Sequence, residues 1–137
     1  MNWFDFTLKL KKFPLTEAKQ QLKQIQEISN DDYAAYLTKQ KQEILNHHQT
    51  HNNFYKALLQ GKKVANWEDL PILTKKDLQQ PLEERLSDGY SITEVYVNKT
   101  SGSSGHPFIF AKDKYAHALT WSVIMNRFGW FGIDFNS

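Results

Sequence analysis

The segment that most constrains the fold is a glycine- and hydroxyl-rich loop between two stretches with the composition of strands. It reads Thr-Ser-Gly-Ser-Ser-Gly-His-Pro over residues 100–107 and separates residues 95–99 from residues 108–111. Valine, isoleucine and aromatic residues favour strands, and a short Gly/Ser-rich connection between two such runs favours a hairpin. We therefore expect a strand, this loop and a returning strand.

The loop has two possible roles. Gly102 and Gly105 free the backbone to expose its N–H groups, and four hydroxyls add donors, which together suit phosphate oxygens. Glycine and serine are also ordinary turn residues, so a purely structural turn closed by Pro107 remains the alternative. A Walker A loop is excluded because no lysine follows Gly105, and a dinucleotide fingerprint because a strand follows instead of a helix.

The first sixty residues have a helical pattern. Apolar residues recur every three or four positions over residues 16–29, which predicts one buried helical stripe. Asp31 or Asp32 is expected to cap a second helix, and Asn52 or Asn53 a short third one. The second helix would carry the apolar residues Tyr33, Leu37, Ile44 and Leu45.

The pattern changes after residue 70. Thr74 and Asp77 have the spacing of a capping box, which predicts a short helix that begins at Thr74 and is ended or bent by Pro81. Alternation over residues 90–99 predicts the first strand, and Asp113 is expected to cap a final helix.

These elements predict an α/β fold. A mostly helical region over residues 1–89 would precede a strand, the Ser/Gly loop, a strand and a helix over residues 90–137. No linker-like segment divides the chain, so the boundary near residue 89 is a change in structure type.

Composition excludes several classes of protein. The chain has 137 residues, which suits one folding unit, and its formal charge of +2 is too small to indicate nucleic acid or an anionic membrane as a partner. Cysteine is absent, which excludes disulfides and thiolate chemistry and favours the cytoplasm. No apolar run approaches the length of a membrane span.

Other chemically suggestive residues have simpler explanations. His47, His48 and His51 lack a nearby carboxylate that would complete a metal site, so they are interpreted as a solvated helix end and no metal is expected. Residues 9–12 contain three lysines that suit a solvated surface. His117 has no catalytic partner that the sequence identifies. Four aromatic residues near the end are expected in the core, namely Trp121, Phe128, Trp130 and Phe131.

The order of motifs resembles a known family. Residues 70–78 read Leu-Pro-Ile-Leu-Thr-Lys-Lys-Asp-Leu, and the Ser/Gly loop follows about twenty residues later. This order is similar to the N-terminus of the adenylate-forming (AMP-binding) enzymes. The phenylacetate-coenzyme A ligase branch, with its relatives in capsular polysaccharide biosynthesis, is the most similar. The resemblance runs from about residue 33 to the end and also includes Phe54, Tyr55, Asp113, Trp121, Arg127, Gly129 and Asp134.

The resemblance implies a function for the loop. Its members would hold the β- and γ-phosphates of ATP while a small-molecule carboxylate attacks the α-phosphorus, with Mg²⁺ sharing the charge and coenzyme A as a possible acceptor. The residues in question are Thr100, Ser101, Gly102, Ser103, Ser104 and Gly105. The sequence departs from the family at Phe108 and His106, where members often carry lysine, and His106 is an auxiliary candidate.

The family's later motifs, which hold adenine, ribose, magnesium and the catalytic lysine, do not occur in these residues. We therefore expect an N-terminal fragment that is inactive alone and that exposes apolar surface at Trp130, Phe131 and Phe135. The alternative is a small helical interaction module in which the hairpin is structural. The sequence does not indicate an oligomeric state.

Overall fold

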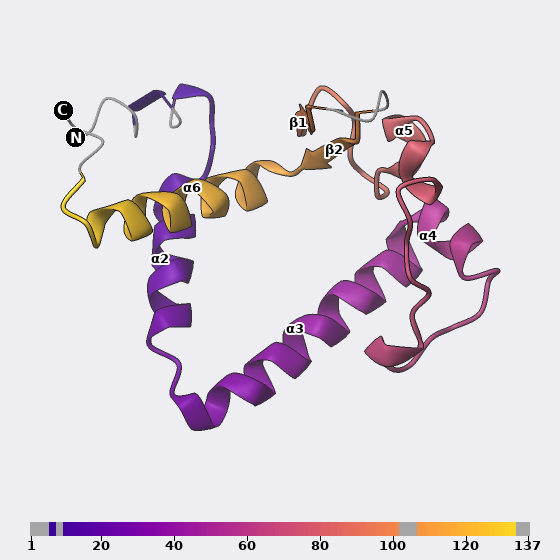
Figure 1. The fold of residues 1–137 in the computed structure, drawn as a ribbon, viewed down its shortest axis with the longest axis horizontal. Helices are drawn as coiled ribbons and strands as arrows, with labels where there is room; N and C mark the ends of the chain where they lie inside the picture. The colour runs from indigo at the N-terminus through magenta and orange to yellow at the C-terminus, as the bar shows by residue number, and fades with distance from the viewer. Residues whose placement is uncertain (1–5, 8–9, 102–106, 134–137) are drawn as a thin grey trace. The chain divides into compact units, whose positions relative to one another are not determined.

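The computed structural model describes residues 6–7, 10–101 and 107–133. These residues are mostly helical and include one small two-stranded sheet (Figure 1). The chain divides into two compact units, which we call the helix-pair unit (residues 1–28 and 112–137) and the corner unit (residues 29–111). The helices in the described ranges include none that combines the length and the apolar character needed to cross a bilayer.

The helix-pair unit consists of α2 (Leu15–Gln26) packed against α6 (Lys114–Gly129). Leu15 and Ala18 of α2 are fully buried, as are the small residues Ala118 and Ser122 of α6. Small side chains let two helix backbones approach closely, so the predicted apolar stripe of α2 is used for packing. At the far end of the pair, Gln26 Nε2 donates to Asn126 Oδ1 at 3.0 Å.

Both ends of α6 follow from local sequence. Asp113 caps the helix as expected, because its side chain accepts a hydrogen bond from Ala116 N at 2.6 Å. Beyond Gly129, Trp130 is 69% exposed and Phe131 80% exposed, and Phe128 is exposed as well. The prediction that these three aromatic residues lie in the core is therefore wrong, whereas Trp121 is half-buried. The other expectation, exposed apolar surface at Trp130 and Phe131, is confirmed, and Phe135 lies outside the described residues. Phe128, Trp130 and Phe131 lie in or after the last turn of α6, beyond the last buried residue of this helix, Ser122.

The corner unit begins with the long helix α3 (Asn30–His51), followed by α4 (Asn53–Leu58). Ser29 caps α3 instead of Asp31 or Asp32, since Ser29 Oγ accepts from Asp32 N and donates to Asp32 Oδ2. Asp32 thus binds the hydroxyl of the cap with its side chain and with its backbone N–H. Asn52 caps α4, which confirms one of the two expected positions.

The region between α4 and the sheet is less helical than expected. It contains η1 (Trp67–Asp69), η2 (Asp77–Gln79) and α5 (Leu82–Arg85). The predicted helix from Thr74 is wrong, because only a 3₁₀ turn forms there. Proline disfavours helical geometry in the residue before it, and Gln80 is accordingly extended. Pro81 therefore ends the 3₁₀ turn, as expected of the helix, and also directly precedes the first residue of α5.

The two strands are β1 (Tyr96–Lys99) and β2 (Ile109–Lys112), and they pair with each other as a hairpin. The first strand is shorter than the predicted residues 90–99 because Ser91 and Glu94 form a turn. Ser91 N and Ser91 Oγ both donate to Glu94 Oε2, at 3.1 and 2.6 Å. The expected pair of strands is confirmed, whereas most of the loop between them lies outside the described residues, and a domain boundary near residue 89 stays a prediction.

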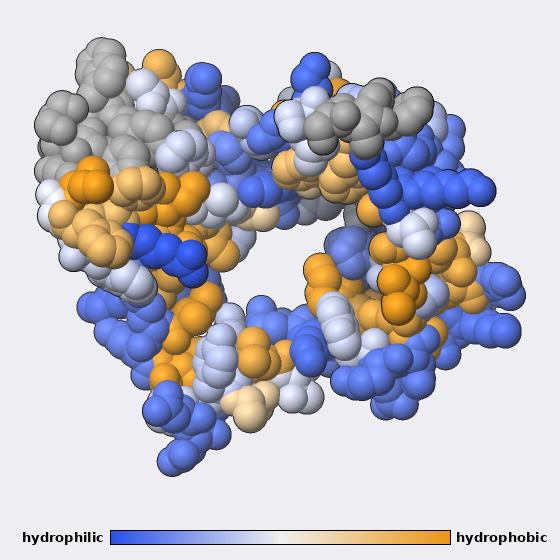
Figure 2. All heavy atoms as spheres, in the orientation of Figure 1, coloured by the Kyte–Doolittle hydropathy of each residue, from blue (hydrophilic) through white to orange (hydrophobic). Residues whose placement is uncertain are grey.

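Hydrophobic residues also lie at the surface of both units (Figure 2). On α3, Leu45 is buried, but Tyr33, Leu37 and Ile44 are each at least 40% exposed. The apolar residues predicted for this helix therefore do not form one buried stripe within the corner unit.

Candidate functional site

The candidate site is the closed end of the hairpin, where the two strands meet the Ser/Gly loop. Thr100 N donates to Phe108 O at 2.9 Å, and Phe108 N donates to Thr100 Oγ1 at 2.9 Å. Thr100 thus uses both its backbone and its side chain to close the loop. Because a hydroxyl that accepts one hydrogen bond retains its own hydrogen, Thr100 can still donate to a ligand.

The structure describes two of the six predicted phosphate-binding residues. Thr100 is in the closing pair, and Ser101 next to it is exposed. The other four, together with the auxiliary candidate His106, lie outside the described residues: Gly102, Ser103, Ser104 and Gly105. Their assignment to phosphate stays a prediction.

Arg85 is the cation next to the closed end of this hairpin. Its Nη2 donates to Ile109 O at 2.8 Å, its Nε donates to Gln80 O at 3.0 Å, and its guanidinium carbon is 5.7 Å from the centre of the Phe108 ring. Burial lowers the pKa of Arg85, although an arginine remains charged near neutral pH. Within the described ranges, no carboxylate forms an ion pair with Arg85.

The backbone of Arg85 is fixed as well, by the buried residue Asn52. Asn52 Nδ2 donates to Arg85 O at 3.0 Å and lies 3.3 Å from Ser87 Oγ, while Asn52 Oδ1 accepts from Tyr55 N at 2.9 Å. One amide therefore caps α4 and binds the end of α5. This arrangement links the helical corner to the residue that holds the hairpin.

The Leu-Pro segment upstream forms a small hydrogen-bonded turn. Asp77 Oδ2 accepts from Thr74 N at 2.8 Å and from Thr74 Oγ1 at 2.6 Å. The hydrogen bond from the Thr74 side chain is the main reason that the pKa of Asp77 is lowered. The predicted pairing of these two residues is confirmed, although it stabilises a turn and not the start of an α-helix.

Of the three histidines at the end of α3, His51 is exposed as the sequence suggested, whereas His47 and His48 are half-buried. His47 Nε2 lies 3.2 Å from Ser87 Oγ, and His48 stacks on Tyr55 with ring centres 5.2 Å apart. Burial, and to a lesser degree His47, lowers the pKa of His48. Its Nδ1 is buried and, among the residues described, has no hydrogen-bond partner. Nowhere in the described ranges do three or more His, Cys, Asp or Glu residues form a group that could hold a metal ion.

His117 belongs to the packing of the helix-pair unit. It is 7% exposed, its ring centre lies 4.8 Å from that of Phe13, and its Nε2 accepts from Trp121 Nε1 at 3.1 Å. Burial is the main reason that its pKa is lowered, with Lys112 contributing. A neutral imidazole that accepts from an indole is a structural group in this position.

Arg85 and Asn52 are the residues at this site whose roles the sequence did not indicate. Asn52 was expected to cap α4, but its bond to Arg85 O joins residues 33 positions apart. The only local signal for Arg85 was that it precedes the Ser-Asp-Gly turn as the one arginine upstream of the loop.

Comparison with known proteins adds no family assignment, because no family model, curated protein or solved structure matches this chain.

Proposed function

We propose that these residues are the N-terminal part of an ATP-dependent carboxylate-activating ligase of the adenylate-forming type. In the reaction, a carboxylate oxygen would attack the α-phosphorus of ATP, the bond to pyrophosphate would break, and an acyl-adenylate would form. Coenzyme A is the proposed acceptor in a second step. The observation that carries the proposal is the motif order, a Leu-Pro-x-x-Thr-Lys-x-Asp-Leu segment followed by a Ser/Gly loop between two paired strands.

The described residues suit the phosphate part of this reaction. The Thr100 hydroxyl has a hydrogen left to donate, and the guanidinium of Arg85 binds the carbonyl of Ile109, which is two residues after the end of the loop at Pro107. Donors and a cation at this place would stabilise the charge that develops on departing pyrophosphate. Arg85 would also offset the absence of a lysine at Phe108.

The described residues offer Mg²⁺ no cluster of carboxylates, so the ion would be held mainly by the phosphates of ATP. Mg²⁺ would supply charge neutralisation for the same oxygens. Since the family's adenine-binding and catalytic motifs do not occur in these 137 residues, we expect weak phosphate binding and no adenylation by them alone. A cytoplasmic location is part of the proposal, because ATP is available there and the chain has no cysteine.

The test is a titration of the isotopically labelled chain with magnesium pyrophosphate, followed by NMR. We expect shifts of the amides of Thr100, Ser101 and Ile109 in the millimolar range, and we expect Gly102→Val to abolish them without lowering stability. Gly129→Val is the matched control, because a Cβ at Gly129 meets nothing within 4 Å. Shifts that are absent, or that survive Gly102→Val, would contradict the proposal.

A helical interaction module is the second candidate function, and the exposed apolar residues of α3 favour it. Tyr33, Leu37 and Ile44 would then contact a partner, and the hairpin would be structural. Under this alternative, Gly102→Val leaves every binding property unchanged, whereas Leu37→Asp removes the interaction. The two candidates therefore predict opposite results for the same pair of variants.

A further inference from the structure

A second candidate binding site lies in the corner unit, beside the end of α4. None of its residues belongs to the hairpin. It is a cavity of about 410 Å³ lined by Gln49 and Thr50 of α3, by Lys56 and Leu59, and by residues 61–63. Ligand cavities typically range from about 300 to 1,000 Å³, so this one has room for a small molecule.

The shape of the cavity is set by hydrogen bonds on the chain reversal after α4. Gln60 and Gly61 both have positive φ angles, and Gly61 N donates to Lys56 O at 3.0 Å. Farther along, the Gln49 side chain binds both backbone groups of Val64: its Nε2 donates to Val64 O at 2.9 Å, and its Oε1 accepts from Val64 N at 2.7 Å. These bonds return residues 62–64 to α3 and place Lys62 and Lys63 on the same cavity as Lys56.

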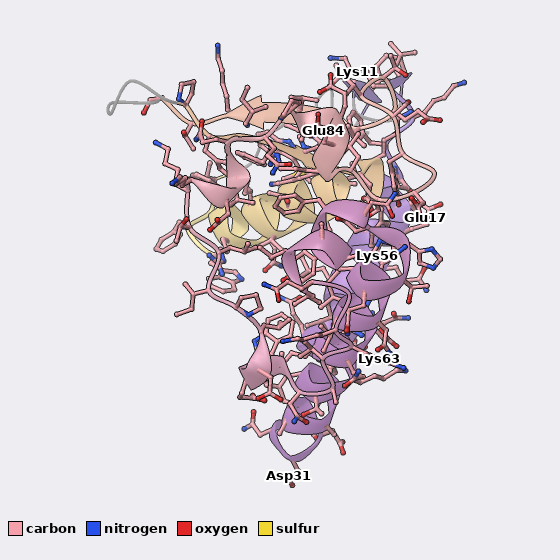
Figure 3. The ribbon with its side chains drawn as sticks, turned by 90° about the vertical axis from the view of Figure 1, so that its right-hand side faces the viewer. Lys11, Glu17, Asp31, Lys56, Lys63 and Glu84 are labelled. Atoms are coloured by element: carbon pink, nitrogen blue, oxygen red, sulfur yellow. The ribbon has the colours of Figure 1, made fainter. Side chains whose placement is uncertain are left out.

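The cavity concentrates positive charge without a counter-charge. Three of its seven lining residues are lysines, and none is acidic. In the described ranges, the exposed lysines Lys23 and Lys39 each pair with a glutamate on the same helix, whereas no carboxylate pairs with Lys56, Lys62 or Lys63. In Figure 3, the labelled carboxylate Glu84 lies well apart from Lys63.

We propose that this cavity binds a small soluble anion that carries two or more phosphate groups. Lysine ammonium groups bind phosphate as point charges, and three of them around one cavity suit an anion with several charges. The Thr50 hydroxyl and the second N–H of the Gln49 amide add neutral donors, and Leu59, which is 7% exposed, provides an apolar wall. The anion relieves the mutual repulsion of the three ammonium groups.

Lysines in the last turn of a helix or just after it also stabilise its C-terminus, and this role makes a different prediction. If Lys56, Lys62 and Lys63 act only on the end of α4, their replacement lowers the melting temperature without any ligand. If they form an anion site, their replacement removes repulsion, so the melting temperature without anion stays the same or rises at low ionic strength.

The test uses inorganic tripolyphosphate as the probe, with the full chain at low ionic strength. We expect it to bind, and we expect the triple variant Lys56→Gln, Lys62→Gln, Lys63→Gln to weaken binding about tenfold or more. The triple variant Lys11→Gln, Lys12→Gln, Lys114→Gln removes the same charge from exposed positions of the helix-pair unit and is the control. Gln49→Leu, which changes no charge, is expected to weaken binding by opening the clasp on Val64.

Several outcomes would overturn the proposal. Equal losses in the two triple variants would mean nonspecific attraction, and a fall in melting temperature without anion would mean a helix-end role. Equal binding of citrate would remove the preference for phosphate. Binding to vesicles that contain phosphoinositide, without binding to tripolyphosphate, would identify a membrane headgroup instead of a soluble anion. When Gly102→Val is present in both chains that are compared, the triple variant of the cavity lysines is expected to weaken binding by the same factor, which separates this site from the hairpin's function.

Discussion

The helix-pair unit and the corner unit differ in the contacts that stabilise each of them internally. In the helix-pair unit, α2 and α6 bury Leu15, Ala18 and Ala118, and Gln26 with Asn126 adds a hydrogen bond at the end. The corner unit also buries Leu45, Leu59 and Leu82, but several hydrogen bonds join residues that are far apart in its sequence: Asn52 to Arg85 O, Arg85 to Ile109 O, and Gln49 to Val64.

The difference lies in how each unit responds to a change in one residue. Close packing of helices depends on volume, so it tolerates a change in polarity at its edge but not an added methylene group. A tie made by one amide or guanidinium depends on donors and acceptors, so removing those groups leaves buried backbone atoms without partners. The polar ties also fix loops and turns in place, which suits the corner unit as the location of both candidate binding sites.

The largest expected effect is from Asn52→Ala in the corner unit. This change removes the cap of α4 and leaves Arg85 O and Tyr55 N without their partners, so we expect a loss of about 2–4 kcal/mol in the free energy of unfolding. Urea denaturation measures the loss, and Asn53→Ala at the adjacent exposed position is the control. Equal stabilities of the two variants would show that the polar tie is not what holds the corner.

The next effect is from Ala118→Leu in the helix-pair unit. Ala118 has no exposed surface, so the larger side chain overpacks the contact between α2 and α6, and we expect a loss of about 1–3 kcal/mol. Ala35→Leu at an exposed position of α3 should be almost neutral in the same denaturation experiment. If Ala118→Leu is also neutral, the two helices are not closely packed.

A smaller and more local effect is expected from Arg85→Gln. The hairpin loses the hydrogen bond to Ile109 O and the contact with the Phe108 ring, which costs about 1–2 kcal/mol. Hydrogen exchange should become faster at the amides of β1 and β2 and stay unchanged in α3. The control is Glu84→Gln at the exposed neighbouring position, and equal exchange in the two variants would exclude Arg85 as the anchor of the hairpin.

The smallest expected effect is a dependence of stability on pH from two histidines, the half-buried His48 in the corner unit and the buried His117 in the helix-pair unit. Burial lowers the pKa of His48 and of His117 in the folded chain. The unfolded chain therefore takes up protons near pH 6.5 where the folded chain does not, and stability falls as the pH decreases from about 6.5 towards the lower folded pKa. Well above pH 6.5, both histidines are neutral in the folded and the unfolded chain, so they cause no change of stability with pH.

We expect His48→Gln and His117→Gln each to reduce this slope when the free energy of unfolding is measured from pH 7 to pH 5. Because the two residues are in different units, their contributions should add in the double variant. A slope that neither variant changes would assign the pH dependence to other groups.

Some of these local structures could be predicted from the sequence, and others could not. The caps Asn52 and Asp113 were predictable because a cap binds a backbone N–H three residues away. Pro81 was expected only to end or bend a helix, whereas it has two roles: Gln80 before it is extended, and α5 begins directly after it.

The candidate sites depend on contacts that no local pattern encodes. Arg85 binds Ile109 across 24 positions, and Gln49 binds Val64 across 15, so neither tie has a characteristic spacing. The strand composition predicted the hairpin, but the binding of phosphate by its loop stays a prediction. The sequence did not indicate this cavity, because only the chain reversal at Gln60 and Gly61 brings Lys62 and Lys63 to the same cavity as Lys56 of α4.

The closing pair of the hairpin has a consequence for changes in loop length. Thr100 and Phe108 bind each other with two hydrogen bonds, so strand register does not depend on how many residues join them. Doubling the length of a flexible connection costs only about 0.6 kcal/mol in closure entropy. We therefore expect that residues 101–107 can be replaced by sequences of other lengths without loss of the hairpin. The hairpin is thus a suitable place for grafting new binding sequences.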